Sequence, residues 1–322
     1  MGETPLLIWA VSDGRAGMEN QVMGLAEAVA RLTPAYIERK RIAIRAPFDK
    51  LPRMLMGPSL SRLSADSDSL DPPWPDLWIG CGRRVVPLSI EMKRHVPMVV
   101  QTQDPRARLG GFDLVIPPEH DELKGDNVFP ILGSPNRLEE NRLRTEAGML
   151  IEDLGLDEDQ RYAAVLIGGD SKDYQMTGPV ITLMLEALAA AEDEGYRLLI
   201  TPSRRTPEFV KHHLREALPD AWIWDGEPVG RVVNPYFGML GVAERFYVTG
   251  ESANMLTDAA FTGKPIHMLP LEGGAPKWQR FHQALEDRHI LKPHCGPDDQ
   301  WTYEPLRETD RAAAEILRRM GR

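Results

Sequence analysis

Apolar and polar residues alternate along the first half of the chain in blocks that predict strands followed by helices. Short apolar runs, typical of strands buried on both faces, span residues 6–11, 37–44, 77–79, 98–101, 114–116 and 128–131. Segments with one apolar helical face span residues 20–32, 51–57, 85–94 and 136–154. This order predicts a parallel sheet with helices on its faces.

The same succession restarts in the second half of the chain. Predicted strands span residues 162–167, 197–200, 222–224, 246–248 and 266–269, and predicted helices span 180–194, 206–217, 236–243, 253–262 and 276–288. A last helix follows near the end of the chain, with Thr309 or Asp310 as its expected N-cap.

Two runs of strand-helix units in 322 residues predict an α/β protein with two Rossmann-like domains facing a central cleft. We expect the domains to comprise residues 1–150 and 151–305, and the helix within 306–322 to cross back and pack near the first domain. Because ligands of such sheets bind at the carboxyl ends of the strands, the loops at those ends are the candidates for chemistry.

Composition narrows the class of protein. With 42% hydrophobic and 27% charged residues, the chain is typical of a globular protein, and its net charge of −10 argues against a generic nucleic-acid binder. Its two cysteines, Cys81 and Cys295, argue against a disulfide scaffold or a cysteine-rich zinc site. The first residues lack the pattern of a signal peptide, so we expect a cytoplasmic protein without a membrane span.

The charge is distributed unevenly along the chain. Residues 35–64 hold seven basic and two acidic residues, interleaved with leucine and methionine, although the whole chain is acidic. Such a segment suits contact with an anionic membrane, which would make the protein peripheral to the inner face of that membrane. The alternative is a strand followed by a short amphipathic core helix whose arginines reach out to solvent.

The first strand of the chain ends in the polar sequence SDGRAGMENQ. It supplies carboxylates, a glycine turn and hydrogen-bonding side chains at the edge where a ligand is expected, namely Asp13, Gly14, Arg15, Glu19 and Asn20. A regular G-x-G-x-x-G is absent, which disfavours a simple nicotinamide dinucleotide site. The alternative is a glycine turn in which Asn20 or Glu19 caps the following helix.

Two further loops of the first half are polar at the same edge. The sequence IGCGRR (79–84) places Arg83 and Arg84 where a helix opens, which suits either an anion or an ordinary exposed first turn. The sequence QTQDPR (101–106) ends a strand with Gln103, Asp104 and Arg106, and we expect it to form a wall on the acceptor side.

In the second half, two glycine-rich or basic loops follow neighbouring strands. The sequence GGDSKD (168–173) permits close backbone approach, and the sequence TPSRRTP adds an anion-binding turn. The residues that we expect to contact a phosphate or hydroxyl are Gly168, Gly169, Ser171, Ser203, Arg204 and Arg205.

The segment VTGESANMLTDAAFTGKP gives the most specific signal. A strand ends in VTGES and a helix opens at once, so its free N–H groups and positive dipole end face the expected site. Asp258, further along the helix, suits the hydroxyls of a ribose. The candidate donor-binding residues are Gly250, Glu251, Ser252, Asn254, Met255 and Asp258. The alternative is a capped amphipathic helix between two buried strands.

This segment resembles the donor-binding segment of GT-B glycosyltransferases, in particular the N-acetylglucosaminyltransferase that acts on lipid-linked muramyl peptide. That segment reads Gly-Gly-Gly-x-(Ser/Thr)-x-x-Glu-Ala-x-x-x-Gly-x-Pro, and GESANMLTDAAFTGKP is similar, with Asp258 in place of the glutamate. The sequence QRFHQAL resembles a Gln-x-x-Asn-Ala donor segment but departs from it at His282 and Gln283. The resemblance implies a GT-B-like fold with a donor-binding second domain.

Along nearly its whole length the chain resembles the family of plant mitochondrial fission factors named for elongated mitochondria, with their bacterial homologues. The resemblance is carried by SDGRAGMENQ, QTQDPR, DLVIPPEHD, NVFPILGSPNRL, NPYFGML and VTGESANMLTDAAFTGKP. It implies a two-domain protein with a glycosyltransferase-like fold, whose plant members act in fission at the mitochondrial surface. The fold alone does not establish an activity.

The favoured function is a metal-independent glycosyltransferase that takes a nucleotide sugar as substrate, needs no other cofactor, and acts on a lipid-linked or membrane-associated acceptor. Its general base would be Asp13 or Glu19, with Asp104 as the second choice. Glu251 and Asp258 are seven residues apart, against eight in the paired acidic motif of many retaining enzymes, which favours inversion. The alternative is a non-catalytic scaffold that recruits partners at a membrane. An epimerase with a nicotinamide cofactor lacks its glycine fingerprint here.

Overall fold

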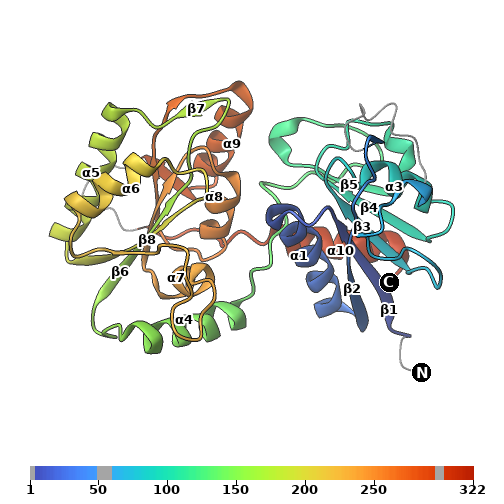
Figure 1. Cartoon of the computed structure of the whole chain (residues 1–322), viewed down its shortest axis with the longest axis horizontal. Coiled ribbons are helices and arrows are strands. Elements are labelled where there is room, and N and C mark those ends of the chain that lie inside the picture. The colour runs from blue at the N-terminus through green and yellow to red at the C-terminus, as the bar shows by residue number, and fades with distance from the viewer. Residues whose placement is uncertain (1–3, 49–59, 294–300) are drawn as a thin grey trace. The chain divides into compact units, whose positions relative to one another are not determined.

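The computed structural model describes residues 4–48, 60–293 and 301–322, which fold into two compact units (Figure 1). Unit 1 comprises Met1–Arg137 and Arg307–Arg322, and unit 2 comprises Leu138–Leu306. The contacts therefore divide the chain after Arg137 and not at the expected residue 150.

The sheet of unit 1 has the order β2-β1-β3-β4-β5, and all its strand pairs are parallel. The strands are β1 (Leu6–Ser12), β2 (Ala35–Arg41), β3 (Leu77–Cys81), β4 (Met98–Thr102) and β5 (Leu114–Ile116). The helices are α1 (Ala16–Leu32), α3 (Val86–Met92) and α10 (Glu308–Met320), with short 3₁₀ turns at Leu60–Arg62, Leu109–Gly111 and Glu119–Asp121.

Because a strand is pleated, its successive side chains point to opposite faces of the sheet and pack in different cores. Ile8 and Ile79 pack in a core shared with α1 and α10, whereas Trp9 and Trp78 pack in the core under α3. Because both faces of the sheet are covered, the central strands are apolar without interruption, which is why they could be recognised in the sequence.

Unit 2 contains a second parallel sheet, with the order β13-β11-β10-β6-β8-β9. Its strands are β6 (Arg161–Ile167), β8 (Tyr196–Pro202), β9 (Trp222–Ile223), β10 (Arg245–Thr249), β11 (Ile266–Leu269) and β13 (Leu291–Pro293). The helices are α4 (Glu140–Leu154), α5 (Gly178–Asp193), α6 (Glu208–Ala217), α7 (Tyr236–Val242), α8 (Ala253–Ala260) and α9 (Pro276–Asp287). The α/β class with parallel sheets is thus confirmed.

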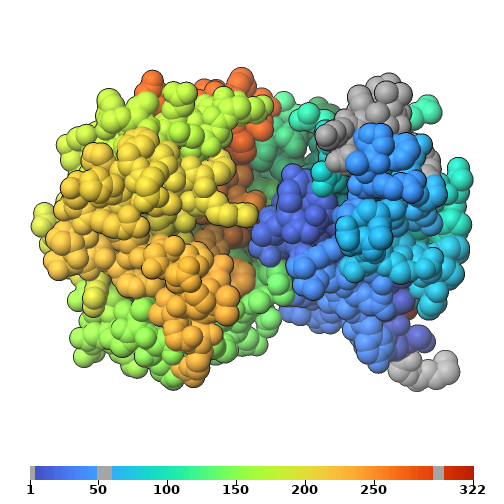
Figure 2. All heavy atoms as spheres, in the orientation of Figure 1, coloured from blue at the N-terminus to red at the C-terminus, as the bar shows by residue number. Residues whose placement is uncertain are grey.

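On the near face of unit 2, the surface is formed largely by α6 (yellow) and α7 (orange) with their adjoining loops (Figure 2). Strands β7 (Tyr174–Gln175) and β12 (Glu272–Gly273) form a short antiparallel pair outside the main sheet. No helix within the described residues is long and apolar enough to cross a membrane.

Helix α4 belongs to unit 2 because it packs closely against α7. A Cβ atom on Gly241 would lie 2.5 Å from the carbonyl oxygen of Leu143, and one on Gly238 would lie 2.8 Å from that of Glu146. These two glycines of NPYFGML therefore allow the backbones of the two helices to approach. The sequence shows that α4 is a helix but not which sheet it joins.

Two predictions of local structure were wrong in detail. Residues 128–131 form isolated bridges at Val128 and Ile131 and no strand, since Pro130 lacks the N–H that a ladder needs. Helix α10 begins at Glu308 with Arg307 as its N-cap, so neither Thr309 nor Asp310 caps it. The hydroxyl of Thr309 instead accepts the N–H of Asn136 at 3.0 Å. The predicted helix 51–57 lies outside the described residues.

Candidate functional site

The loops that follow β6, β8 and β10 of unit 2 meet at the carboxyl edge of its sheet. At this point, between β6 and β10, the direction of strand order reverses. Strands β8 and β9 follow β6 in one direction and β11 and β13 follow β10 in the other, so this is the switch point where α/β sheets bind ligands. The Gly168 N–H donates to Thr249 Oγ1 at 2.8 Å, and the Ser203 N–H donates to the Ile167 carbonyl at 2.7 Å.

Gly168 and Gly169 are glycines because the three loops touch at their α-carbons. A Cβ atom on Gly168 would lie 1.5 Å from Glu251 Oε1, and one on Gly169 would lie 2.1 Å from the Arg205 carbonyl oxygen. The N–H of Gly169 donates to Glu251 Oε1 at 2.7 Å. We expected both glycines to contact a phosphate or hydroxyl, but the N–H groups of both are bonded within the protein.

Glu251 is a buried carboxylate at the base of these loops. Its side chain is 1% exposed, and Oε1 accepts hydrogen bonds from the Gly169 N–H and, at 3.3 Å, from Arg205 Nη2. Oε2 is buried and has no hydrogen-bond partner among the described residues. Burial raises the pKa of Glu251, although the Gly169 hydrogen bond and Arg205 act in the opposite direction.

The basic loop after β8 presents arginines to solvent and uses its hydroxyls internally. Ser203 Oγ accepts the Arg205 N–H at 3.1 Å and lies 3.2 Å from Thr206 Oγ1. The Arg205 side chain is 50% exposed, and its Nη1 donates to the Asp170 carbonyl at 3.4 Å. Arg204 is also exposed. Ser203 thus shapes the turn, and the arginines are the groups that can reach an anion.

The loop after β6 is shaped in the same way by Ser171. Its Oγ accepts the N–H groups of Asp173 at 3.2 Å and Tyr174 at 3.1 Å. Tyr174 is buried, and burial raises the pKa of its phenol, with a further contribution from the charge of Glu251. Sequence reasoning missed Tyr174 because β7 and β12 are only two residues long.

Helix α8 opens at this edge without a side-chain cap. Ser252 is the N-cap residue and forms no side-chain capping hydrogen bond. The first backbone bond of the helix runs from the Leu256 N–H to the Ser252 carbonyl at 3.0 Å, so the N–H groups of Ala253, Asn254 and Met255 have no helical acceptor. Together with the helix dipole, these donors favour an anion.

Asp258 lies in the same helix and has a partner that sequence reasoning missed. The Tyr236 hydroxyl donates to Asp258 Oδ2 at 3.0 Å. Burial and the neighbouring carboxylate raise the pKa of Tyr236, so the phenol remains a proton donor. The tyrosine thereby fixes one oxygen of the aspartate. The segment NPYFGML stands out in the sequence, but nothing in it indicates this pairing.

At the end of β10, Gly250 is held by a histidine from α9. The His282 Nε2 atom lies 2.6 Å from the Gly250 carbonyl oxygen, and burial lowers the pKa of His282, so the ring is neutral and donates this hydrogen bond. A Cβ atom on Gly250 would lie 3.1 Å from Met268 Sδ. The segment QRFHQAL therefore does lie against the α8 loop.

In unit 1, the carboxyl edge of β1 carries Asp13 and Gly14. The Asp13 side chain is 2% exposed and lies 2.8 Å from Arg15 Nη2 and 3.0 Å from Arg15 Nε. Gly14 has a φ of 79°, a conformation that favours glycine. Asn20 is exposed on α1.

Glu19 links α1 to β2. Its carboxylate accepts Arg41 Nε at 2.7 Å and Arg39 Nη1 at 3.3 Å, and the hydrogen bond from Arg41 is the main cause that lowers the pKa of Glu19. A carboxylate held ionised in this way is a weak proton acceptor. Glu19 is thus held by two arginines, as Asp13 is held by Arg15.

The QTQDPR loop adopts an uncommon backbone. Gln103 has a φ of 66° and Arg106 a φ of 47°, and the Arg106 N–H donates to Asp104 Oδ1 at 2.7 Å. The Gln103 amide donates to Oε1 of Gln21 at 3.1 Å. Gln21 belongs to the polar segment SDGRAGMENQ, but it was not selected as a site residue from the sequence. Non-glycine residues with positive φ often mark functional loops.

The IGCGRR loop does not provide a nucleophile. Cys81 is buried, and burial raises the pKa of its thiol to about 12. The thiol therefore stays protonated and unreactive.

Among the described residues, no group of three or more His, Cys, Asp and Glu side chains is arranged to hold a metal ion.

The described part of the basic segment 35–64 contains the edge strand β2. Arg39 and Arg41 pair with Glu19, and Lys40 Nζ lies 2.9 Å from Glu38 and 4.5 Å from the centre of the Trp9 ring. The positive charge of this strand is therefore partly compensated within unit 1.

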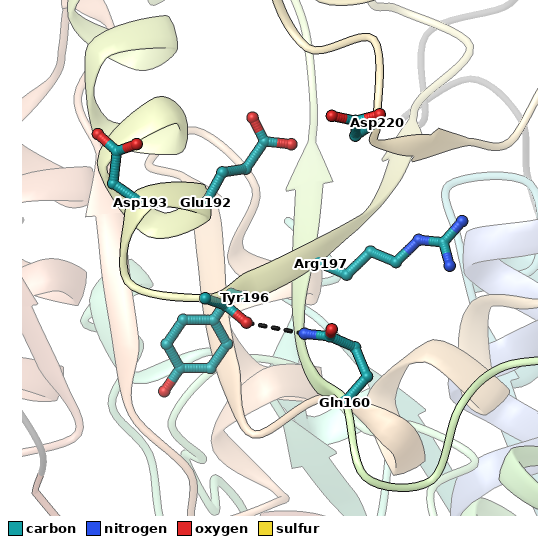
Figure 3. A pocket seen from close by; sticks show the side chains of 7 residues that line it. Gln160, Glu192, Asp193, Tyr196, Arg197 and Asp220 are labelled. Carbon is teal, nitrogen blue, oxygen red and sulfur yellow. Dashed lines mark hydrogen bonds between the residues drawn. The ribbon is translucent and has the colours of Figure 1, made fainter.

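A recess at the opposite, amino edge of the unit 2 sheet has a volume of about 510 Å³ (Figure 3). It lies where β8 begins, and Gln160 Nε2 donates across it to the Gly195 carbonyl at 2.7 Å. Burial and the charges of Asp220 and Asp193 raise the pKa of Glu192 there. The excess of carboxylates makes the recess unsuitable for a phosphate.

The family model described as "Mitochondrial fission ELM1" matches residues 16–320. The Mitochondrial fission protein ELM1 of Arabidopsis thaliana is 26% identical, over 77% of this chain, and the match spans 64% of that protein's length. The uncharacterized protein RP120 of Rickettsia prowazekii is 24% identical, over 97% of both chains.

Among solved structures, the UDP-GlcNAc 2-epimerase of Methanocaldococcus jannaschii superposes with a TM-score of 0.53. The sequences are 10% identical, and the match covers 99% of each chain. At this identity the likeness shows a shared fold and nothing about activity.

Proposed function

The chain belongs to the mitochondrial fission ELM1 family, and from this premise we propose that it is a metal-independent glycosyltransferase of the GT-B type that uses a nucleotide sugar. The observation that carries the proposal is the uncapped start of α8 beside Arg205, at the switch point of the unit 2 sheet. The fold is shared with a protein whose name states a nucleotide sugar, UDP-GlcNAc.

In the proposed complex, unit 2 binds the donor. The diphosphate accepts hydrogen bonds from the N–H groups at the start of α8 and from Arg205, and the Asp258 carboxylate accepts a ribose hydroxyl. Gly168 and Gly169 contribute by letting the loops meet and not by direct contact. No metal ion is needed, because the helix N-terminus and the arginine supply the positive potential.

For the transfer itself we propose Asp13 as the general base, with Asp104 as the second choice. The acceptor hydroxyl loses its proton to the carboxylate while its oxygen bonds to the anomeric carbon, and the bond from that carbon to the diphosphate breaks. This displacement inverts the anomeric centre. Arg15, which pairs with Asp13, would stabilise the carboxylate between turnovers.

The alternative is a non-catalytic scaffold of the same fold. It is favoured by one observation, the buried carboxylate of Glu251 in the place proposed for an anion. A scaffold that has lost the nucleotide-binding cleft would bind no nucleotide sugar, and the following experiment tests for that loss.

We expect a UDP, GDP, ADP or CMP sugar to raise the melting temperature, since a ligand at 100 times its Kd stabilises the native state by about 2.7 kcal/mol. Asp258→Asn, which still accepts the Tyr236 hydrogen bond, should weaken that binding about tenfold because a charged acceptor is lost. Asp287→Ala, at an exposed position of α9, is the control. No response to any of these sugars would leave only the scaffold.

We also propose that residues 35–64 contact an anionic membrane that carries the acceptor. Neutralising Arg39, Lys40, Arg41 and Arg53 should reduce co-sedimentation with phosphatidylglycerol vesicles, since each basic residue near such a surface contributes about 1 kcal/mol. Arg53 lies outside the described residues. Neutralising the exposed Arg144, Arg161, Arg197 and Arg204 of unit 2 is the control. Equal binding by the two variants would exclude this face.

A further inference from the structure

The Glu251 carboxylate accepts hydrogen bonds from donors that could also bind an anion. Its Oε1 accepts the Gly169 N–H at 2.7 Å and Arg205 Nη2 at 3.3 Å, and the residue directly precedes the N-cap of α8. Its side chain is 1% exposed, and Oε2 accepts no hydrogen bond from the described residues. One oxygen of the carboxylate is thus held by the loops, and the other lies buried without a donor.

The position of Arg205 allows it to exchange its contact with the Glu251 carboxylate for a contact with a ligand. Its side chain is 50% exposed, and its two contacts, to Glu251 Oε1 and to the Asp170 carbonyl, are long at 3.3 Å and 3.4 Å. Phosphate oxygens form short, charge-assisted and often bidentate bonds with a guanidinium. A diphosphate at the start of α8 would therefore compete successfully for Arg205.

The other groups around Glu251 do not supply a positive charge that could replace the charge of Arg205. Tyr174, from β7, is a neutral phenol whose pKa is raised, and His282, from α9, is a neutral ring that donates to Gly250. From the β6 loop, the Asp170 carboxylate accepts the Met176 N–H at 2.8 Å. From the end of β10, Thr249 contributes an uncharged hydroxyl. Without Arg205, the Gly169 hydrogen bond, the Thr249 hydroxyl and the dipole of α8 still favour the charged carboxylate, but none of these groups carries a full positive charge.

We infer that binding of a diphosphate moves Arg205 from Glu251 to the ligand and that Glu251 takes up one proton as this happens. The inference rests on the proposed donor site. The proton comes from solvent and is held on Oε2, the oxygen without a donor, while Oε1 keeps the Gly169 hydrogen bond. Protonation removes the repulsion between a buried carboxylate and the diphosphate.

The sign of the pH dependence follows from the partners of Glu251. Burial already raises the pKa of Glu251 in the free protein, whereas hydrogen bonds from Gly169, Thr249 and its own backbone, and the charge of Arg205, act in the opposite direction. When Arg205 leaves and an anion arrives, the pKa of Glu251 rises further. Between the free and bound pKa values the complex holds more protons than the free protein, so affinity increases as pH falls, by up to about tenfold per pH unit.

The test is calorimetric titration of the protein with UDP-glucose, GDP-mannose and ADP-glucose in two buffers of different ionisation enthalpy. A diphosphate diester does not itself titrate near neutral pH, so buffer-dependent heat reports protons taken up by the protein. We expect uptake approaching one proton in the wild type. Glu251→Gln, whose amide oxygen can still accept the Gly169 N–H, should take up none and bind about tenfold more tightly at the alkaline end of the window.

The outcomes separate this inference from the proposed function. Binding without proton uptake, at an affinity that does not change with pH, overturns the inference and leaves the donor site standing. The absence of binding overturns both. His282→Asn is the matched control for the other titratable side chain: uptake that persists in Glu251→Gln and vanishes in His282→Asn assigns the proton to the histidine and overturns the inference. The wild-type measurement needs no variant, so it stands even if Glu251→Gln does not fold.

Discussion

Gly169→Ala is expected to destabilise unit 2 by about 3 kcal/mol and to abolish nucleotide-sugar binding. The added Cβ would lie 2.1 Å from the carbonyl oxygen and 2.2 Å from the carbonyl carbon of Arg205. Backbone atoms on a turn held by Ser203 and Thr206 cannot move aside as a side chain would. The loops after β6 and β8 must then separate, and the Glu251 hydrogen bond is lost with them. Urea denaturation followed by circular dichroism measures the loss.

Gly148→Ala is the matched control for this substitution. Gly148 is exposed within α4, and a methyl group added there would have no neighbouring atom within 4 Å. Alanine should therefore stabilise the same unit by about 0.5–1 kcal/mol, because it lowers the entropy of the unfolded chain and favours the helix. Equal stability of the Gly169 and Gly148 variants would show that the three loops do not meet as described.

The strands and helices of both sheets were largely predictable because each sheet is covered on both faces. Central strands such as β6 and β10 are then continuous apolar runs, and the helices between them show one apolar face. Strands β7 and β12 were not predictable, since a two-residue strand has no periodicity to detect. The membership of α4 depended on its tertiary contact with α7, which the order of elements along the chain does not reveal.

The position of the candidate site was predictable for a topological reason, whereas its internal bonds were not. Loops that follow parallel strands lie at one edge of the sheet, so SDGRAG, GGDSKD and VTGES could be selected from the sequence. The hydrogen bond from Gly169 to Glu251 joins residues 82 positions apart, and the one from Tyr236 to Asp258 joins residues 22 positions apart. Neither pairing follows from a local pattern.

The arginine partners of the candidate bases likewise could not be predicted from a local sequence pattern. In the sequence, Asp13 and Glu19 are equivalent carboxylates of one loop. The structure places Glu19 in α1 against Arg41, 22 residues away, while Asp13 pairs with Arg15 in its own turn. The strand β2 that brings Arg41 was expected, but the side of α1 that it would meet was not. Both carboxylates are therefore paired with an arginine, and the partner of Glu19 follows only from the tertiary structure.

Arg205→Ala is expected to weaken nucleotide-sugar binding about 100-fold. Charge-assisted hydrogen bonds to the diphosphate are lost, at about 1.5–3 kcal/mol, and Glu251 remains buried without its cation beside the ligand. Calorimetric titration measures the affinity. Arg144→Ala removes the same charge from an exposed position of α4 and should change the affinity by less than about threefold. If Glu251 repels the diphosphate once Arg205 is gone, Arg205→Ala combined with Glu251→Gln should bind more tightly than Arg205→Ala alone, so that the two effects are not additive. An equal loss from both arginine variants would mean that general positive potential, and not the guanidinium beside Glu251, attracts the nucleotide sugar.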